Sequence, residues 1–95
     1  MDDLNFDEGA KLLAALANDK RLHILQIISR EEIAVGDLAD RVGLSQSALS
    51  QHLARLRSDA FVTTTRQAQN IYYSTSHPGV CRMLETLDDM RGGHE

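Results

Sequence analysis

Two apolar repeats within residues 36–57 constrain this fold more than any other part of the chain. Gly43 separates the two repeats, and Ser45 precedes the second. Apolar residues recur at every third or fourth position, which is the period of an amphipathic helix. They are Leu38, Ala39 and Val42, then Leu49, Leu53 and Leu56. The pattern predicts a helix-turn-helix over about 35–57, with Ser45 as the N-cap of its second helix.

The second of these helices leaves an unusual set of side chains on its outer face. A helix that needs only solubility usually carries Glu and Lys there. This one carries amides, hydroxyls and one guanidinium, from Gln46, Ser47, Ser50, Gln51 and Arg55. Such groups suit the edges of bases and the oxygens of phosphates. Double-stranded DNA is therefore the expected partner, and an uncharged solvated face is the alternative.

The rest of the chain must supply a small aliphatic core. Of the 95 residues, 42% are hydrophobic, none is Trp and only four are Phe or Tyr. We expect one domain over residues 1–95. Cys81 is the single cysteine, so no intramolecular disulfide can form. No signal peptide or apolar run of membrane-spanning length is evident, which predicts a cytoplasmic protein without a membrane partner.

Charge is divided unevenly along the chain, whose formal net charge is −4 at pH 7. Residues 1–40 carry a net −5 and residues 76–95 a net −2, whereas residues 41–75 carry a net +3. The positive part contains the second helix of the helix-turn-helix, so it would face phosphate while the remaining surface repels it. Chance clustering in a short chain is the alternative.

Helical and strand patterns flank the helix-turn-helix. After an acidic start, leucines predict a first amphipathic helix, and Asn18 is the predicted N-cap of a second, central helix. Residues 61–65 and 71–75 are rich in β-branched and aromatic side chains, which predicts two strands joined by the polar loop 66–70. Such a hairpin is a wing, here about 61–75. The expected class is mainly α (α+β), a winged helix-turn-helix in the order α-α-α-α-β-β-α.

A last helix is expected over about 77–91, with Pro78 in its first turn. Its full apolar stripe could pack on its own domain or against a second copy. Because a domain of this size gains from covering more apolar surface, we expect a homodimer through the terminal helices. The expected interface comprises Leu12, Leu16, Val80, Met83, Leu84, Leu87 and Met90.

Three stretches resemble the ArsR/SmtB family of bacterial winged-helix repressors. Residues 17–22 are similar to its Ala-Asn-Pro-x-Arg-Leu signature, with Asp19 in place of Pro. Residues 42–53 and 68–73 resemble the NolR/HlyU-like subgroup, and the similarity covers about 10–90. The resemblance implies a repressing homodimer, with recognition helices in successive major grooves of an imperfect inverted repeat and wings at the flanking minor grooves or backbone. Many members release DNA when a metal ion or a sulfur oxidant binds.

The candidate DNA-binding residues lie on the second helix of the motif and on the wing. They are Ser45, Gln46, Ser47, Ser50, Gln51, His52, Arg55, Arg57, Arg66, Gln69 and Asn70. Glutamine suits adenine, whereas Arg66 suits a narrow minor groove. Ser45 could instead only cap its helix, and His52 could be a partly buried structural histidine. Either Arg55 or Arg57 could form a surface ion pair.

The sensor sites of the resembling family are not reproduced. Ala34 and Gly36 stand where the third-helix metal motif has cysteines, and the terminal-helix zinc motif lacks its carboxylate before His77. Gln26 and about Gly92 stand where sulfur sensors have their two cysteines. We expect no metal and no cofactor. The alternative is a redox- or metal-responsive repressor that uses His23, His77, Cys81 or His94.

The sequence therefore predicts a sequence-specific transcriptional repressor that binds an inverted repeat as a homodimer. A winged helix used for protein–protein contact is a further alternative, which the arginine-bearing, acid-poor face disfavours. An enzyme is not expected, because His52 has no convincing nucleophile partner and the sequence has no glycine loop that cradles phosphate.

Overall fold

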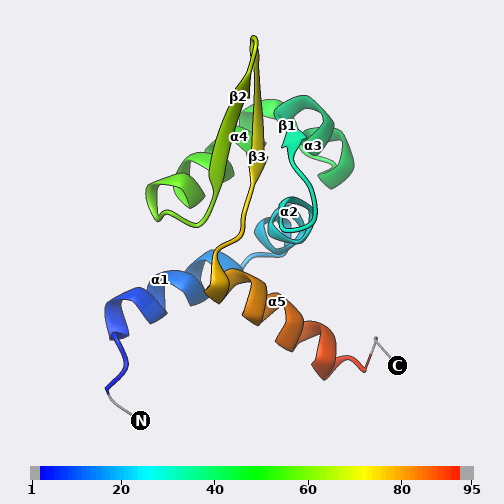
Figure 1. The fold of residues 1–95 in the computed structure, drawn as a ribbon. Coiled ribbons are helices and arrows are strands. Elements are labelled where there is room, and N and C mark those ends of the chain that lie inside the picture. Colours follow the sequence, from blue (N-terminus) through cyan, green and yellow to red (C-terminus); the bar gives the residue numbers. More distant parts are fainter. Residues whose placement is uncertain (1–2, 93–95) are drawn as a thin grey trace.

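The computed structural model describes residues 3–92, so His94 lies outside the described part. The elements are α1 (Phe6–Leu16), α2 (Asp19–Ile28), β1 (Ile33–Ala34), α3 (Val35–Val42), α4 (Gln46–Ser58), β2 (Thr63–Gln67), β3 (Asn70–Ser74) and α5 (Pro78–Met90). Figure 1 shows the β2–β3 hairpin projecting past the helices at one end, with α1 and α5 spread out at the other. The mainly helical class and the winged helix-turn-helix are confirmed. The structure adds one short strand, β1.

Both predicted N-caps are confirmed by hydrogen bonds. Asn18 Oδ1 accepts from the Arg21 N–H at 3.0 Å, and Ser45 Oγ accepts from the Ala48 N–H at 3.1 Å. Asp19 is the first residue of α2. An acid at this position interacts favourably with the positive end of the helix dipole, so the replacement of the signature proline leaves a well-started helix.

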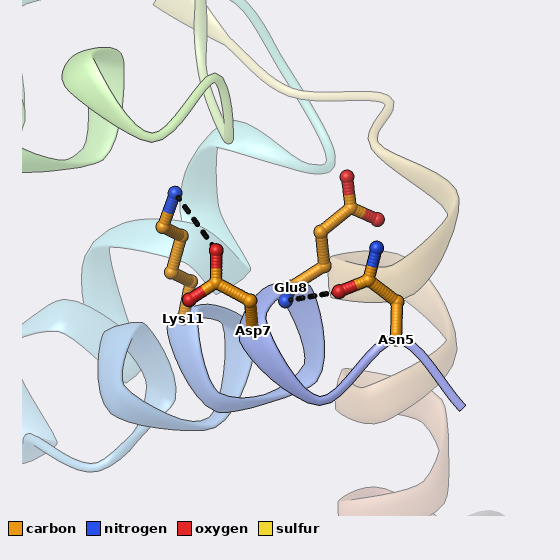
Figure 2. Close-up of polar contacts among 4 residues, drawn as sticks. All are labelled: Asn5, Asp7, Glu8 and Lys11. Carbon is orange, nitrogen blue, oxygen red and sulfur yellow. Dashed lines mark hydrogen bonds and ion pairs between the residues drawn. The ribbon is translucent and has the colours of Figure 1, made fainter. Parts of the chain in front are cut away.

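Helix α1 begins earlier than its leucines indicated. Asn5 Oδ1 accepts from the Glu8 N–H at 3.0 Å and caps the helix at Phe6. Figure 2 shows this cap beside the ion pair between Asp7 and Lys11, whose charged atoms lie 3.9 Å apart. The acidic start is thus partly the first turn of α1, where carboxylates favour a helix. The period of the apolar residues did not predict this first turn, because capping and charge stabilise it without an apolar repeat.

Helix α2 lies at the centre of a single aliphatic core. Every helix except α1 contributes at least one fully buried side chain to it, and the largest are Ile24, Leu25, Ile28, Leu38, Leu49, Leu53, Leu56 and Val80. The leucines that predicted the helix-turn-helix are therefore the residues that hold α3 and α4 in place. Among residues 3–92, no helix combines the length and apolar content that a bilayer span requires.

Lys20 and Arg21, at the start of α2, each hydrogen-bond to the end of a neighbouring helix. Arg21 donates from Nε to the Ala15 carbonyl and from a terminal guanidinium nitrogen to the Ala14 carbonyl, both at 3.0 Å. Lys20 Nζ donates to the Val42 carbonyl at 3.1 Å. Because the last carbonyls of a helix have no partner within it, Arg21 completes the end of α1 and Lys20 the end of α3. The start of α2 thereby fixes both neighbouring helices.

The sheet has three antiparallel strands in the order β1-β3-β2. Ile33 of β1 pairs with Tyr73 of β3, and Thr64 of β2 pairs with Tyr73 on its other side. The predicted wing is confirmed, but its strands run further toward the tip and enclose only Ala68 and Gln69. The loop predicted over 66–70 was too long, because polar residues can pair in an exposed hairpin as well as β-branched ones. A two-residue strand such as β1 is too short to show a period.

A buried hydrogen-bond joint connects the sheet to α5. Thr75 donates from Oγ1 to the Phe61 carbonyl at 2.6 Å, and its N–H donates to the Ile28 carbonyl at 2.9 Å. His77 follows, and its Nδ1 accepts from the Val80 N–H at 3.2 Å as the N-cap of α5. The His77 ring also meets the Phe61 ring edge to face at 5.0 Å. The wing, the end of α4 and the start of α5 are therefore held at one point.

Left-handed backbone at the ends of α3 and α4 gives a first prediction. Gly43 has φ +73° and Ala60 has φ +63°, and Ala60 closes α4 with bonds from its own N–H and the Phe61 N–H. A left-handed alanine carries strain of about 1–2 kcal/mol, which exceeds the entropy that glycine adds to the unfolded chain. Ala60→Gly should raise the free energy of unfolding by about 0.5–1 kcal/mol, measured by urea denaturation.

Gly43→Ala is the matched control, because it places the same strain at the turn between α3 and α4. It should lower the free energy of unfolding by about 1 kcal/mol. No heavy atom beyond its chain neighbours lies within 4 Å of a Cβ built on Gly43, so the loss would come from the backbone and not from a clash. A destabilised Ala60→Gly protein would contradict this account of the helix ends.

Candidate nucleic-acid interface

Helix α4 buries one stripe and exposes the other. Leu49, Leu53 and Leu56 are 0%, 1% and 0% exposed and lock the helix onto the core. With 3.6 residues per turn, the centre of the opposite face falls on Ser47 and Gln51, with Ser50 and Arg55 at its edges. All four are exposed. The structure thus brings these four sequence-predicted residues together on one outward surface.

Two predicted residues at the start of α4 are already engaged within the protein. Ser45 uses its Oγ as the N-cap acceptor. Gln46 lies against α3, since its side-chain nitrogen would be 3.6 Å from a Cβ built on Gly36. Both residues remain exposed, so these contacts leave them accessible at the side of the outward surface.

His52 turns away from the outward surface and is partly buried. Burial, and then the positive charge of Arg21, lower the pKa of His52 below its ordinary value of 6.5. The ring is therefore neutral at pH 7 and lies near the cation that completes the end of α1. These features fit the structural histidine that the sequence left open as an alternative.

The cations of this region differ in how they are paired. Arg55 and Arg57 lie exposed in the last turn of α4, and within residues 3–92 neither forms a salt bridge. Arg41 contributes to the positive net charge of the segment, but its guanidinium lies 3.0 Å from a Glu31 carboxylate oxygen. The charge available to an anionic partner thus comes from α4 and the wing.

The wing residues lie at the exposed end of the hairpin (Figure 1). Arg66 is on β2, and its Nε donates to the Ala68 carbonyl at 3.4 Å, which directs the side chain along the tip. Ala68 has φ +56°, a conformation for which glycine is better suited. Gln69 and Asn70 are exposed beside it. The structure therefore brings Arg66, Gln69 and Asn70 together at the tip of the hairpin.

Sequence reasoning missed two residues of α4 that share its outward face. Ala54 and Ser58 are exposed and continue the line of Ser47 and Gln51 at helical spacing. The same spacing in the sequence could have found them, but an alanine and a terminal serine carry no chemical signal of their own. A small side chain such as that of Ala54 permits close approach of a groove floor or a thymine methyl.

Residues 18–64 match the family described as bacterial regulatory protein, arsR family. The nodulation protein NolR of Rhizobium meliloti is 55% identical over 84 residues, which are 88% of this chain and 69% of that protein. The chain belongs to the arsR family. It is a DNA-binding transcriptional regulator with the winged helix-turn-helix of that family, and the resemblance seen in its sequence is confirmed.

Solved structures of arsR-family regulators have the same fold. The crystal structure of NolR from Sinorhizobium fredii superposes with a TM-score of 0.87 at 48% identity, over 97% of this chain and 98% of that one. A homodimeric winged helix-turn-helix DNA-binding domain of a possible ArsR-family regulator from Mycobacterium bovis superposes with a TM-score of 0.80. It is 27% identical, over 99% of this chain and 93% of that one.

The residues predicted for an interface between arsR-family protomers fall into two groups. Leu16 and Val80 are 7% and 0% exposed and belong to the protomer's own core, against which Leu12, Met83 and Leu84 also pack. Leu87 and Met90, in contrast, are 40% and 77% exposed. The apolar stripe of α5 therefore serves its own domain in its first half and leaves the second half uncovered.

The residues that the sequence offered for metal or redox sensing fall in two places within residues 3–92. His23 and Cys81 line the same groove of about 650 Å³ between α2 and α5, and Cys81 is partly buried. His77 already uses its Nδ1 to cap α5. Within residues 3–92, no three side chains among His, Cys, Asp and Glu are grouped so that they could hold a metal ion.

The lowered pKa of His52 gives a prediction for stability against pH. The unfolded chain binds a proton at His52 near pH 6.5, whereas the folded protein does so only at lower pH. The stability that depends on a neutral ring is therefore complete above pH 6.5 and is lost as the pH falls through the folded-state pKa. His52→Gln should flatten the decline in melting temperature between pH 7 and pH 5.

His23→Gln removes an exposed imidazole from α2 and is the matched control. The comparison is made by thermal unfolding of the three proteins in the same buffers. Identical slopes for the wild type and His52→Gln would show that burial beside Arg21 does not govern protonation of His52.

Proposed function

We propose that this regulator is a homodimeric repressor that binds an inverted-repeat operator. The observation that carries the proposal is the outward surface of α4. A folded helix that presents hydroxyls and an amide, flanked by unpaired arginines and free of acids, is adapted to a DNA groove. Ser47, Ser50 and Gln51 meet base edges in the major groove, with Gln46 and Ser45 beside them.

The cations hold the protein on the sugar-phosphate backbone. Arg55 and Arg57 meet phosphates beside the major groove, and Arg66 meets the flanking minor groove with Gln69 and Asn70 in support. The excess of acids in residues 1–40 and 76–95 repels DNA from the other surfaces. The regulator thereby docks by one face.

Dimerisation places the DNA-binding faces of the two protomers, each formed by α4 and the wing, on one side of the assembly. Large apolar side chains remain exposed on α1 and α5, including Phe6 at 77%, Leu13 at 58% and Met90 at 77%. Helices α1 and α5 spread away from the wing (Figure 1), so a partner seated on them leaves both wings free. The Mycobacterium bovis domain of the same fold is described as homodimeric, which supports this arrangement.

In this proposal, repression results when the dimer occupies its operator. A dimer with half-sites about one helical turn apart covers the operator and excludes RNA polymerase or a competing regulator. The protein acts by binding and carries no catalytic role in this proposal. Because bacterial DNA lies in the cytoplasm, we place its action there.

Selection of genomic fragments by the purified protein at moderate salt, followed by sequencing of the bound DNA, tests the proposal. The expected result is enrichment of an inverted repeat with half-sites about one helical turn apart. Absence of binding even at low salt would overturn it in favour of a protein-interaction module.

The different roles that we propose for α4 and the wing, base recognition and electrostatic attraction, give a further prediction. Gln51→Ala should weaken binding to the selected operator by about 1–3 kcal/mol and change binding to random DNA little, because a bidentate contact to a base is lost. Arg66→Ala should weaken both and lower the salt dependence of binding, because a cation that the negative potential of the minor groove attracts is lost. Fluorescence anisotropy at several salt concentrations measures both effects. Equal losses on operator and random DNA for the two variants would refute these different roles.

The exposed half of α5 gives a prediction for assembly. Leu87→Glu places a charge among apolar side chains that the partner would cover, so it should convert the dimer to monomers in analytical ultracentrifugation. Thr86→Glu adds the same charge at the neighbouring exposed position, off the apolar stripe, and should remain dimeric. A Leu87→Glu protein that sediments as a dimer would rule out this interface.

A further inference from the structure

One apolar side chain of the wing is exposed and lies outside the hydrophobic core. Ile71 of β3 is 44% exposed and is absent from the core and from the side chains that pack against it. The residues around it at the tip are polar, except for Ala68. An isolated exposed isoleucine needs no explanation by itself. The residue paired with Ile71 across the hairpin, however, is one of the proposed DNA-binding residues.

Strand register places Ile71 directly opposite Arg66. Side chains of directly paired residues lie on the same face of a sheet, so Arg66 and Ile71 form one cross-strand pair. Two residues further from the tip, Thr64 pairs with Tyr73 on that same face. Tyr73 packs against the core. The Arg66–Ile71 pair therefore continues the core side of the sheet beyond the point where the helices cover it.

From this geometry we propose that Ile71 is a DNA-contacting residue, which acts with Arg66 as a two-residue reader of A·T-rich minor groove beside the half-site. The proposal rests on the proposed function and adds to it a residue and a sequence preference. Arg66 supplies the cation that the negative potential of a narrow minor groove attracts. Ile71 supplies an apolar surface that contacts the sugars along the walls of the groove and the base edges on its floor. At A·T pairs this floor lacks the guanine amino group.

Hydrogen bonding at the tip favours this arrangement. Arg66 Nε is held by the Ala68 carbonyl at 3.4 Å, so the guanidinium is directed before DNA arrives. The two-residue turn ends the hairpin in a small tip, from which the side chains of Arg66 and Ile71 can extend into a groove about 6 Å wide. A major-groove contact of Ile71 with a thymine methyl is the competing possibility, and the two contacts respond differently to inosine.

The test uses three duplexes that share the operator selected by the protein and differ only in the flanking pairs, which are A·T, inosine·cytosine or G·C. Inosine·cytosine presents the minor groove of A·T, because inosine lacks the guanine amino group, and a major groove without a thymine methyl. The wild type should bind the A·T and inosine·cytosine flanks alike and the G·C flank about tenfold more weakly. Ile71→Ala should bind the A·T flank about tenfold more weakly than the wild type does, because both protomers lose apolar burial.

Three variants separate the pair from a general defect of the wing. Ile71→Val should retain most of the preference for A·T flanks. Arg66→Ala should abolish the preference and lower the salt slope by about one ion per wing, whereas Ile71→Ala should leave the slope unchanged. Thr63→Ala, at an exposed site on the opposite face of the hairpin, should match the wild type throughout.

The outcomes are distinguishable. If inosine·cytosine behaves like G·C, Ile71 meets a thymine methyl and the minor-groove reader is wrong. If Ile71→Ala binds all three duplexes as the wild type does, Ile71 has no contact with DNA and the proposal is overturned while the proposed function stands. If the selection of genomic fragments yields no operator, the proposed function and this inference fail together.

Discussion

Packing of one α4 stripe against the core is the constraint on which the rest depends. Leu49, Leu53 and Leu56 have no exposed surface beyond 1%, so the rotation of α4 about its axis is fixed by burial. Truncating one of them to alanine would cost about 2–5 kcal/mol, a large part of the stability of a small domain. Because the rotation is fixed, the residues on the opposite face are presented to solvent in one register. The outward surface of α4, which we propose as the DNA-binding surface, is thus a consequence of the core.

The junctions between elements determine how that surface is aimed. Arg21 completes the end of α1 and lies near His52 of α4, and Lys20 completes the end of α3. Thr75 joins the end of α2, Phe61 in the segment between α4 and β2, and, through the His77 N–H, the start of α5. A Cβ on Gly79 would lie 3.1 Å from Leu12, so α1 and α5 also approach closely. The helices that carry the exposed apolar side chains are therefore tied by short polar contacts to the helix and wing that carry the cations.

Much of this architecture could be predicted from the sequence, since it rests on local chemistry. The period of the apolar residues predicted the helices. Asn18 and Ser45 predicted two helix starts, because a side-chain acceptor three residues before a free N–H is a local signal. Features that depend on distant residues could not be read. Strand β1 exists because Ile33 meets Tyr73 across the fold, and Val80 is buried because the first half of α5 packs on the core. The partial burial of His52 likewise depends on the residues that surround it in the fold, so the sequence left it open as an alternative. Contacts to DNA by the predicted site residues stay a prediction.

The balance of charges on the binding face favours discrimination over affinity. Within residues 3–92, the arginines of α4 and the wing have no acidic partner, whereas Arg41 is neutralised by Glu31. In the proposed homodimer each protomer offers three cations to DNA, Arg55, Arg57 and Arg66, so the counterion release that drives sequence-independent binding is limited to these and falls with salt. A regulator built this way must gain its remaining affinity from neutral groups, which contribute only when the base edges match. Random DNA then offers such a protein little, whereas the inverted repeat that we propose as its operator would offer contacts to both protomers at once.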